Sequence, residues 1–211
     1  PESGESYLSC TVHPEKLSQK LAATTPDAVY ITSPDYLGNV SDIKKLADVC
    51  HRFGVPLLVD NAHGAYLAFL EENLHPLDLG ATVCCDSAHK TLPVLTGGAY
   101  LHISDTAPES YANQAKNALA MFGSTSPSYL ILQSLDLANR EIENCKSRIA
   151  QLAENVKKAK ENFAANGFGL CGNEPLKITV CPKSTGYTGY EFADYCESKG
   201  FVCEFADSDY V

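Results

Sequence analysis

Val55-Pro-Leu-Leu-Val-Asp60 is a short apolar run that stops at a carboxylate. The run Ala28-Val-Tyr-Ile-Thr32 precedes it, and an amphipathic stretch between them begins near Ser41, which can cap a helix, and stops at Gly54, which can end one. Strand, helix, strand at this spacing predicts a βαβ unit with parallel strands and a right-handed crossover. Because both runs are continuously apolar, we expect the sheet to be covered on both faces.

Two more apolar runs extend this pattern towards the C-terminus. Ala81-Thr-Val-Cys-Cys85 stops at Asp86, and Gly98-Ala-Tyr-Leu-His-Ile103 follows after a loop. We therefore expect an α/β fold, a three-layer α/β/α domain with a mainly parallel sheet. In such sheets ligands bind at the carboxyl ends of strands. The residues just past such ends are Ser33, Asp60 and the segment from Ser87 to Lys90.

The second half of the chain reads first as helix and then as a new alternation. The pattern is helical from about Pro108 to Phe163, and Ser126-Pro127 begins a long helix that we expect to bend or break once. A β-α-β rhythm follows, with a strand at 176–180, a helix at 190–198 and a strand at 201–205. We predict a major domain over residues 1–169 and the beginning of a small α+β domain over residues 170–211.

Composition narrows the class of protein. The 211 residues are 45% hydrophobic and 20% charged, and the formal net charge of -10 comes without a Lys/Arg cluster, which argues against nucleic-acid binding. No apolar run has the length of a membrane-spanning helix, and no stretch resembles a signal peptide. Nine cysteines without a C-x-x-C pair favour neither a zinc site nor a redox motif. We expect a cytoplasmic protein with no metal, in which the ungrouped histidines are structural: His13, His51, His75 and His102.

Asp60 and Lys90 follow two different strand ends. Adjacent parallel strands lie about 4.8 Å apart, so two such ends can hold a carboxylate and an amine on opposite sides of one pyridine ring. Pyridoxal phosphate needs this pair, a lysine that binds its aldehyde and a carboxylate that keeps its pyridine nitrogen protonated. The amine must be neutral to attack, which burial or nearby positive charge favours.

Four ordered motifs carry a family resemblance. Asp60-Asn-Ala-His-Gly64 resembles the D-x-A-H-G pattern of fold-type-I pyridoxal-phosphate enzymes, and Ser87-Ala-His-Lys-Thr-Leu-Pro93 resembles the S-x-H-K-T-L-P pattern of the Orn/Lys/Arg decarboxylase family. Gly123-Ser-Thr-Ser-Pro-Ser-Tyr-Leu130, with Ser134-Leu-Asp136, is similar to that family's T-S-P-S-Y-L…S-L-D signature. Two further stretches look like the start of its smaller domain: Pro175-Leu-Lys-Ile-Thr179 and Gly189-Tyr-Glu-Phe-Ala-Asp194.

The resemblance implies roles for the residues around the cofactor ring. Lys90 would form the Schiff base with pyridoxal phosphate, and Asp60 would pair with the pyridine nitrogen. Ala62 would pack on one face of the ring, and His63 would lie near the phenolic oxygen or the reacting centre. Asp60 alone has a structural alternative as a helix cap, and His63 as a core histidine.

Further roles concern the phosphate and the substrate. Ser87 and His89 would help hold the phosphate, and His89 can also shuttle a proton. Ser124, Thr125 and Ser126 would reach the phosphate of a dimer partner, and Ser33 and Tyr36 would border the substrate site. The plain alternatives are a core histidine for His89, helix capping for the Ser124–Ser126 segment, and ordinary loop positions for Ser33 and Tyr36.

The implied activity is decarboxylation of lysine, arginine or ornithine to its amine and CO2, in a cytoplasmic homodimer or higher homo-oligomer of amino-acid metabolism and polyamine biosynthesis. Two alternatives stay open: another fold-type-I enzyme (an aminotransferase, a lyase or a desulfurase), and a cofactor-free, catalytically silent fragment. Family members place a phosphate-cradling loop before the first strand seen here, and Gly4 and Ser6 do not form one. We therefore expect a fragment, with the N-terminal part of the major domain missing and the small domain truncated.

Overall fold

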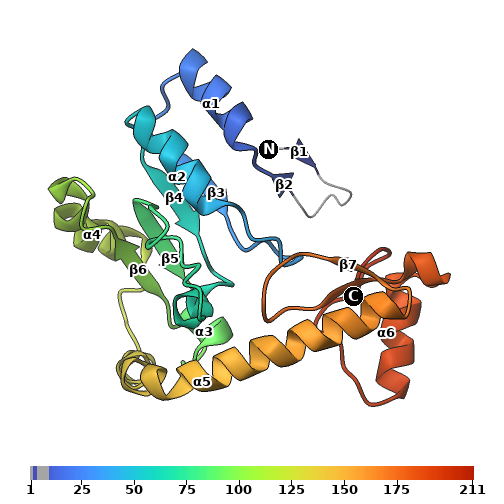
Figure 1. Cartoon of the computed structure of the whole chain (residues 1–211). Helices are drawn as coiled ribbons and strands as arrows, with labels where there is room; N and C mark the ends of the chain where they lie inside the picture. The colour runs from blue at the N-terminus through green and yellow to red at the C-terminus, as the bar shows by residue number, and fades with distance from the viewer. Residues whose placement is uncertain (1, 4–9) are drawn as a thin grey trace. The chain divides into compact units, whose positions relative to one another are not determined.

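The computed structural model describes residues 2, 3 and 10–211; Gly4 and Ser6 lie outside this range. The chain forms two compact units (Figure 1). The first unit comprises residues 1–34 and 41–149, and the second comprises residues 35–40 and 150–211. Helix α5 (Tyr129–Ala165) contributes to both units and is helical from end to end, so of the expected bend or break there is no break. The sequence-based domain boundary at residues 169/170 does not coincide with the limits of these two units, and it stays a prediction.

A four-stranded sheet forms the centre of the first unit. Its order is β3-β4-β5-β6, with β3 to β5 parallel and β6 antiparallel to β5, so the sheet is mainly parallel as predicted (Figure 1). The strands are β3 (Val29–Thr32), β4 (Leu57–Asp60), β5 (Val83–Asp86) and β6 (Tyr100–Ile103).

Three helices connect these strands: α2 (Ile43–Arg52), the 3-10 helix η1 (Ala65–Phe69) and α3 (Ala88–Thr91). Helix α1 (Pro14–Ala23) precedes β3, and α4 (Glu109–Phe122) follows β6. The prediction that Ser41 caps α2 is wrong: the cap is Asp42, which directly precedes the helix and accepts a hydrogen bond from Lys45 N at 3.1 Å. Gly54 ends the helix as predicted. Its φ of +66 is unfavourable for any residue that carries a Cβ atom. Two dipeptide strands, β1 (Glu2–Ser3) and β2 (Cys10–Thr11), pair antiparallel.

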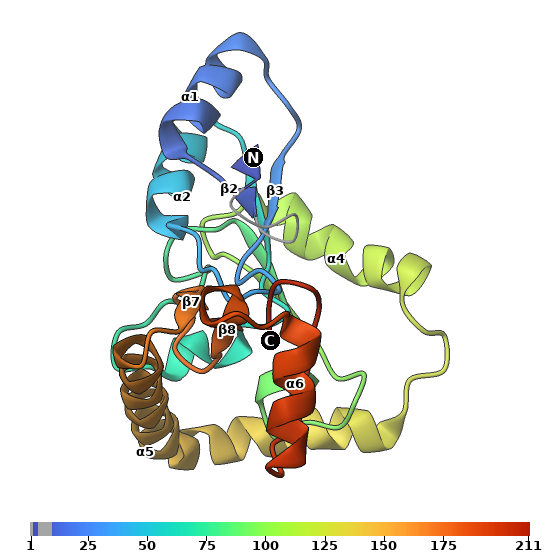
Figure 2. The ribbon, with the colours of Figure 1, turned by 90° about the vertical axis from the view of Figure 1, so that its right-hand side faces the viewer.

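The main core lies on one face of this sheet. Ile31, Leu57 and Val59 are buried there together with apolar residues of α1 and α2, which cover this face (Figure 2). Each such side chain contributes about 1.5–3 kcal/mol on burial. On the opposite face Tyr30 is 65% exposed and Leu101 is 37% exposed. The expected cover on both faces is therefore present on only one face among the residues that the structure describes.

The second unit has its own small sheet and helix. Strands β7 (Gly169–Cys171) and β8 (Thr179–Cys181) pair antiparallel, followed by a 3-10 helix, η2 (Pro182–Thr185), and by α6 (Gly189–Ser198). Thr188 and Glu191 form a capping box at the start of α6. The strand predicted at 201–205 is absent from the described chain, and Phe201 is 71% exposed there.

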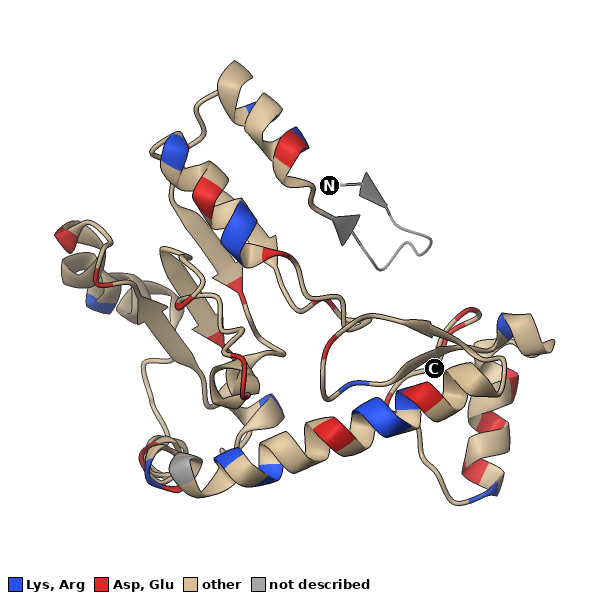
Figure 3. Ribbon diagram, in the orientation of Figure 1, with Lys and Arg blue, Asp and Glu red and all other residues tan. Residues whose placement is uncertain are grey.

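Charged side chains are dispersed over both units. Lys and Arg alternate with Asp and Glu along the helices instead of gathering on one element (Figure 3). Among the described residues, no helix combines the length and the apolar character that crossing a membrane requires.

Candidate active site

Asp60 is the last residue of β4, and its carboxylate is held by two donors. Its Oδ1 accepts a hydrogen bond from Ala62 N at 3.0 Å, and its Oδ2 accepts one from the Tyr30 hydroxyl at 3.1 Å. The hydrogen bond from Ala62 N closes a local turn. The next helix, η1, begins at Ala65 after Gly64, so Asp60 does not cap a helix. A carboxylate offers about four lone-pair positions, so Asp60 retains acceptor capacity for a ligand N–H. Tyr30 was not singled out from the sequence, where it is one more apolar residue of a strand.

Lys90 and His63 are brought together from two neighbouring strand ends. Lys90 belongs to α3, which follows β5, and His63 follows β4. Their side chains meet with Lys90 Nζ 3.1 Å from His63 Nε2. Because Asp60 pairs with Cys85 in the β4–β5 ladder, both loops leave the same edge of the sheet. Lys90 is exposed in this chain, so the burial expected to favour its neutral form does not come from the described residues.

The glycine of the D-x-A-H-G motif has a packing reason. A Cβ atom on Gly64 would lie 2.0 Å from Asn61 Oδ1 and 2.8 Å from Pro34 Cδ. Only glycine allows this close approach, which turns the chain directly after Asp60 and leaves His63 beside Lys90. Ala62, the predicted ring-packing residue, is half-buried within the same turn.

Ser87 and His89 lie shortly before Lys90, at the start of α3. The hydroxyl of Ser87 makes no capping hydrogen bond to α3, although Ser87 directly precedes that helix. His89 Nδ1 lies 3.0 Å from Gly98 O, and His89 N donates to the same oxygen at 3.2 Å. Since a carbonyl only accepts, Nδ1 carries a proton here and the ring is anchored, leaving Nε2 as the nitrogen that can serve a phosphate. The phosphate roles of Ser87 and His89 stay predictions.

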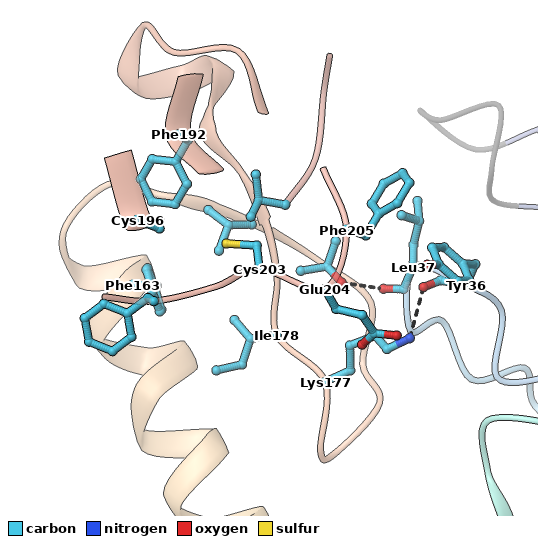
Figure 4. A pocket seen from close by; sticks show the side chains of 14 residues that line it. Tyr36, Leu37, Phe163, Lys177, Ile178, Phe192, Cys196, Cys203, Glu204 and Phe205 are labelled. Carbon is cyan, nitrogen blue, oxygen red and sulfur yellow. Dashed lines mark hydrogen bonds between the residues drawn. The ribbon is translucent and has the colours of Figure 1, made fainter. Parts of the chain in front are cut away.

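Ser33 and Tyr36 fall in different units. Ser33 is buried and its Oγ accepts a hydrogen bond from Ser41 N at 3.0 Å, which favours a structural role. Tyr36 lines a mostly apolar cavity of about 380 Å³ within the second unit (Figure 4). Its carbonyl accepts from Lys177 Nζ at 3.1 Å. The role of both residues in substrate binding stays a prediction.

The segment Ser124–Ser126 lies in the exposed link between α4 and α5. Ser126 N donates to Ser124 Oγ at 3.2 Å, and α5 begins only at Tyr129. Direct capping of α5 is therefore not what these residues do, and the predicted contact with a partner's phosphate remains a prediction.

Two histidines that looked ungrouped in the sequence converge on one buried carboxylate. His75 Nε2 and His102 Nε2 each lie 3.0 Å from Asp86 Oδ2, and Asn61 Nδ2 donates to Asp86 Oδ1 at 2.8 Å. Asp86 is 3% exposed. Burial by itself raises the pKa of Asp86, but hydrogen bonds from His102, His75 and Asn61 outweigh it and hold the pKa below its usual range. We call these four residues the Asp86 cluster; the expectation that His75 and His102 show no grouping is wrong.

The Asp86 cluster also has the residue types of a metal site. The ligand atoms of His75, Asp86 and His102 lie within 4.8 Å of one another. However, Leu77 N donates to His75 Nδ1 at 3.3 Å, so the ring proton is on Nε2 and points to Asp86. A metal-bound histidine instead donates its second nitrogen's proton to an acceptor. The geometry therefore favours a hydrogen-bonded polar core.

Comparisons with known proteins point to one enzyme family. The family model described as Orn/Lys/Arg decarboxylase, major domain, matches residues 6–202. The uncharacterized protein YaaO of Bacillus subtilis is 32% identical over 88% of this chain and 41% of its own length. An arginine decarboxylase of the same organism is 30% identical over 90% of this chain and 42% of its own length. The chain thus spans less than half the length of these relatives.

Solved structures show the same fold. Pyridoxamine-pyruvate aminotransferase from Mesorhizobium loti superposes with a TM-score of 0.73 at 18% identity, covering 95% of this chain and 57% of that one. At this identity the likeness concerns the fold alone. The α/β class with a mainly parallel sheet, predicted from the strand pattern, is confirmed.

Proposed function

Because the chain belongs to the Orn/Lys/Arg decarboxylase family, we propose that the whole protein is a pyridoxal-phosphate-dependent decarboxylase of a basic amino acid. The observation that best supports this proposal is the placement of Asp60 at the end of β4 and of Lys90 just after the adjacent parallel strand β5, inside the matched region. The chain spans less than half the length of these relatives, so the proposal concerns the whole protein.

The residues present fit pyridoxal phosphate. A carboxylate with spare lone pairs, an amine and an imidazole stand at one sheet edge, where Gly64 allows close approach. When bound, the cofactor supplies a protonated pyridine ring that accepts the electron pair left when CO2 departs. Asp60 would hold the proton on the pyridine nitrogen, and Lys90 would bind the aldehyde carbon.

His63 would orient the lysine. With Nε2 3.1 Å from Lys90 Nζ, its imidazole can accept a hydrogen bond from that group and so direct the amine toward the aldehyde carbon of the cofactor. Ser87 would donate a hydrogen bond to the phosphate from the start of α3, and His89 in its doubly protonated form would donate one through Nε2.

The substrate class follows from relatives and from charge. Relatives include arginine decarboxylases, which makes arginine the first substrate to test, with lysine and ornithine next. A formal net charge of -10 attracts cationic amino acids at long range. The same proposal places the enzyme in the reducing cytoplasm, where the free cysteines of the described chain are stable.

We further propose a homodimer. Large apolar side chains are exposed where α4 ends and α5 begins: Phe122 is 87% exposed, Tyr129 85% and Met121 73%. Contiguous exposed apolar residues indicate a protein interface. The segment Ser124–Ser126 lies between them, so a partner subunit docked here would bring these hydroxyls near its own cofactor.

Purified full-length protein tests the proposal directly. Loaded with pyridoxal phosphate, it should be yellow and release CO2 from L-arginine, L-lysine or L-ornithine. Lys90→Ala should lose the visible absorption band of the covalently held cofactor, whereas Lys116→Ala, an exposed lysine of α4, should keep it. A colourless protein that binds no cofactor would overturn the proposal, and amino transfer without CO2 would favour an aminotransferase.

A further inference from the structure

Tyr30 is a strand residue whose side chain reaches the carboxylate of Asp60. In the β3–β4 ladder Thr32 pairs with Asp60, so Tyr30, two residues earlier, projects from the same face at the diagonal position. The hydroxyl donates to Asp60 Oδ2 at 3.1 Å. Tyr30 is 65% exposed, and its ring is therefore not part of the core that holds the sheet.

We propose that Tyr30 is a positioning residue that holds Asp60 in the orientation that receives the pyridine nitrogen of the cofactor. This inference rests on the proposed function, because it concerns the same carboxylate. Neither the D-x-A-H-G motif nor the lysine motif contains Tyr30, which acts from a different strand.

Two anchors define the orientation of the Asp60 carboxylate. Ala62 N holds Oδ1 from the turn that follows β4, and Tyr30 holds Oδ2 from the neighbouring strand. With one anchor alone, the carboxylate can rotate about its Cβ–Cγ bond, which has a broad torsional profile. With both, the carboxylate and its remaining lone pairs are held in fixed directions, and less conformational freedom is lost when a ligand binds.

The phenol of Tyr30 is a suitable donor for holding a carboxylate that must keep its negative charge. Burial, then the charge of Asp60 and their hydrogen bond, raise the pKa of Tyr30, so the phenol stays neutral and protonated near pH 7. A neutral donor holds the carboxylate without cancelling its charge. A lysine or arginine in this place would form an ion pair with Asp60 and compete with the protonated pyridine nitrogen.

A double-mutant cycle on the full-length protein tests the proposal. Pyridoxal-phosphate affinity is measured by equilibrium dialysis for wild type, Tyr30→Phe, Asp60→Ala and the double variant. Tyr30→Phe should weaken binding about three- to tenfold, the size expected for one lost hydrogen bond. In the Asp60→Ala background the same change should have little effect, because Tyr30 then has no carboxylate to hold.

Two controls separate positioning from structure. Tyr190→Phe removes a hydroxyl from a tyrosine that is 58% exposed on α6, and it should leave affinity unchanged. Thermal unfolding of the apoprotein should be the same for Tyr30→Phe and wild type. A merely structural tyrosine would instead lower the melting temperature and weaken binding equally in both Asp60 backgrounds.

The outcomes distinguish this inference from the proposed function. Wild-type protein that binds no pyridoxal phosphate would overturn both. Wild-type protein that binds the cofactor normally, with Tyr30→Phe binding equally well or with equal effects in both backgrounds, would overturn only the role of Tyr30.

Discussion

Asn61 Nδ2 donates a 2.8 Å hydrogen bond to Asp86 Oδ1, and this bond ties the residue after Asp60 to the strand end that leads into Lys90. His102 from β6 and His75 from the segment before β5 complete the Asp86 cluster. The two predicted cofactor residues are therefore carried by strand ends that a buried charged network joins. Such networks are costly when broken, because each member is left without a partner in a low-dielectric site.

Asp86→Asn tests the contribution of this network to stability. The variant keeps the side-chain volume but removes the charge that accepts from both imidazoles. We expect the free energy of unfolding to fall by about 2 kcal/mol. Urea titration of the apoprotein measures it. Asp105→Asn, an exposed aspartate of the same unit, should change it by less than about 0.5 kcal/mol, and equal losses in the two variants would contradict a special role for Asp86.

The cluster also predicts how stability responds to acid. Because the folded-state pKa of Asp86 lies below that of the unfolded chain, about 3.9, its stabilisation is complete above that pH and is lost as the pH falls below it. The polar groups that face it are His75, His102, Asn61 and the Cys84 thiol. Melting temperatures from pH 5 downwards should therefore fall more steeply for wild type than for Asp86→Asn. Parallel curves would show that other carboxyl groups govern acid unfolding.

Gly64→Ala tests the close approach within the D-x-A-H-G turn. The new methyl group would meet Asn61 Oδ1 and Pro34 Cδ at distances that no packed carbon tolerates, so the turn must shift. We expect a destabilisation of about 2–3 kcal/mol together with weaker cofactor binding. At Gly169 the nearest atom to an added Cβ is 3.3 Å away, so Gly169→Ala should cost much less. Wild-type stability for Gly64→Ala would mean that the turn has room.

The hydrogen bond between Tyr30 and Asp60 can be observed without cofactor. The charge of Asp60 and this hydrogen bond both raise the pKa of Tyr30, although burial is the largest cause. Asp60→Ala should therefore lower that pKa and let the tyrosinate absorbance appear at lower pH. Subtracting the titration of Tyr30→Phe, taken in the wild-type and in the Asp60→Ala background, isolates the signal from the other tyrosines. An unchanged midpoint would show that the two groups do not interact in solution.

The exposed apolar side chains between α4 and α5 predict an oligomer interface. A charge placed in such an interface must be desolvated, so Phe122→Asp combined with Tyr129→Asp should shift the full-length protein to a smaller species in analytical ultracentrifugation. Val202→Asp, at a residue 84% exposed in the second unit, provides a matched control that should keep the wild-type mass. A double variant that stays at the wild-type mass would place the interface elsewhere.

The parallel strands could be predicted because each is a local apolar run between turn residues. The parallel strands with right-handed crossovers and the location of Asp60 and Lys90 at strand ends were predicted from that pattern, whereas the strand order was not. Features that depend on contacts between distant residues could not be predicted in this way. The run at 201–205 is as apolar as a strand, but within the described chain it pairs with no neighbour, and an unpaired apolar run does not form a strand by itself.

By itself the sequence determined the α/β class and the family and predicted the pair of Asp60 and Lys90, because these depend on contiguous residues: apolar runs, turn residues and short motifs. Tertiary structure alone decided what holds that pair. Tyr30 reaches Asp60 only because β3 and β4 pair in one register, and His75 and His102 meet Asp86 only through the packing around β5 and β6. Register and packing depend on the summed burial of the whole sheet, so no short stretch of the sequence shows which polar side chains will come within hydrogen-bonding distance.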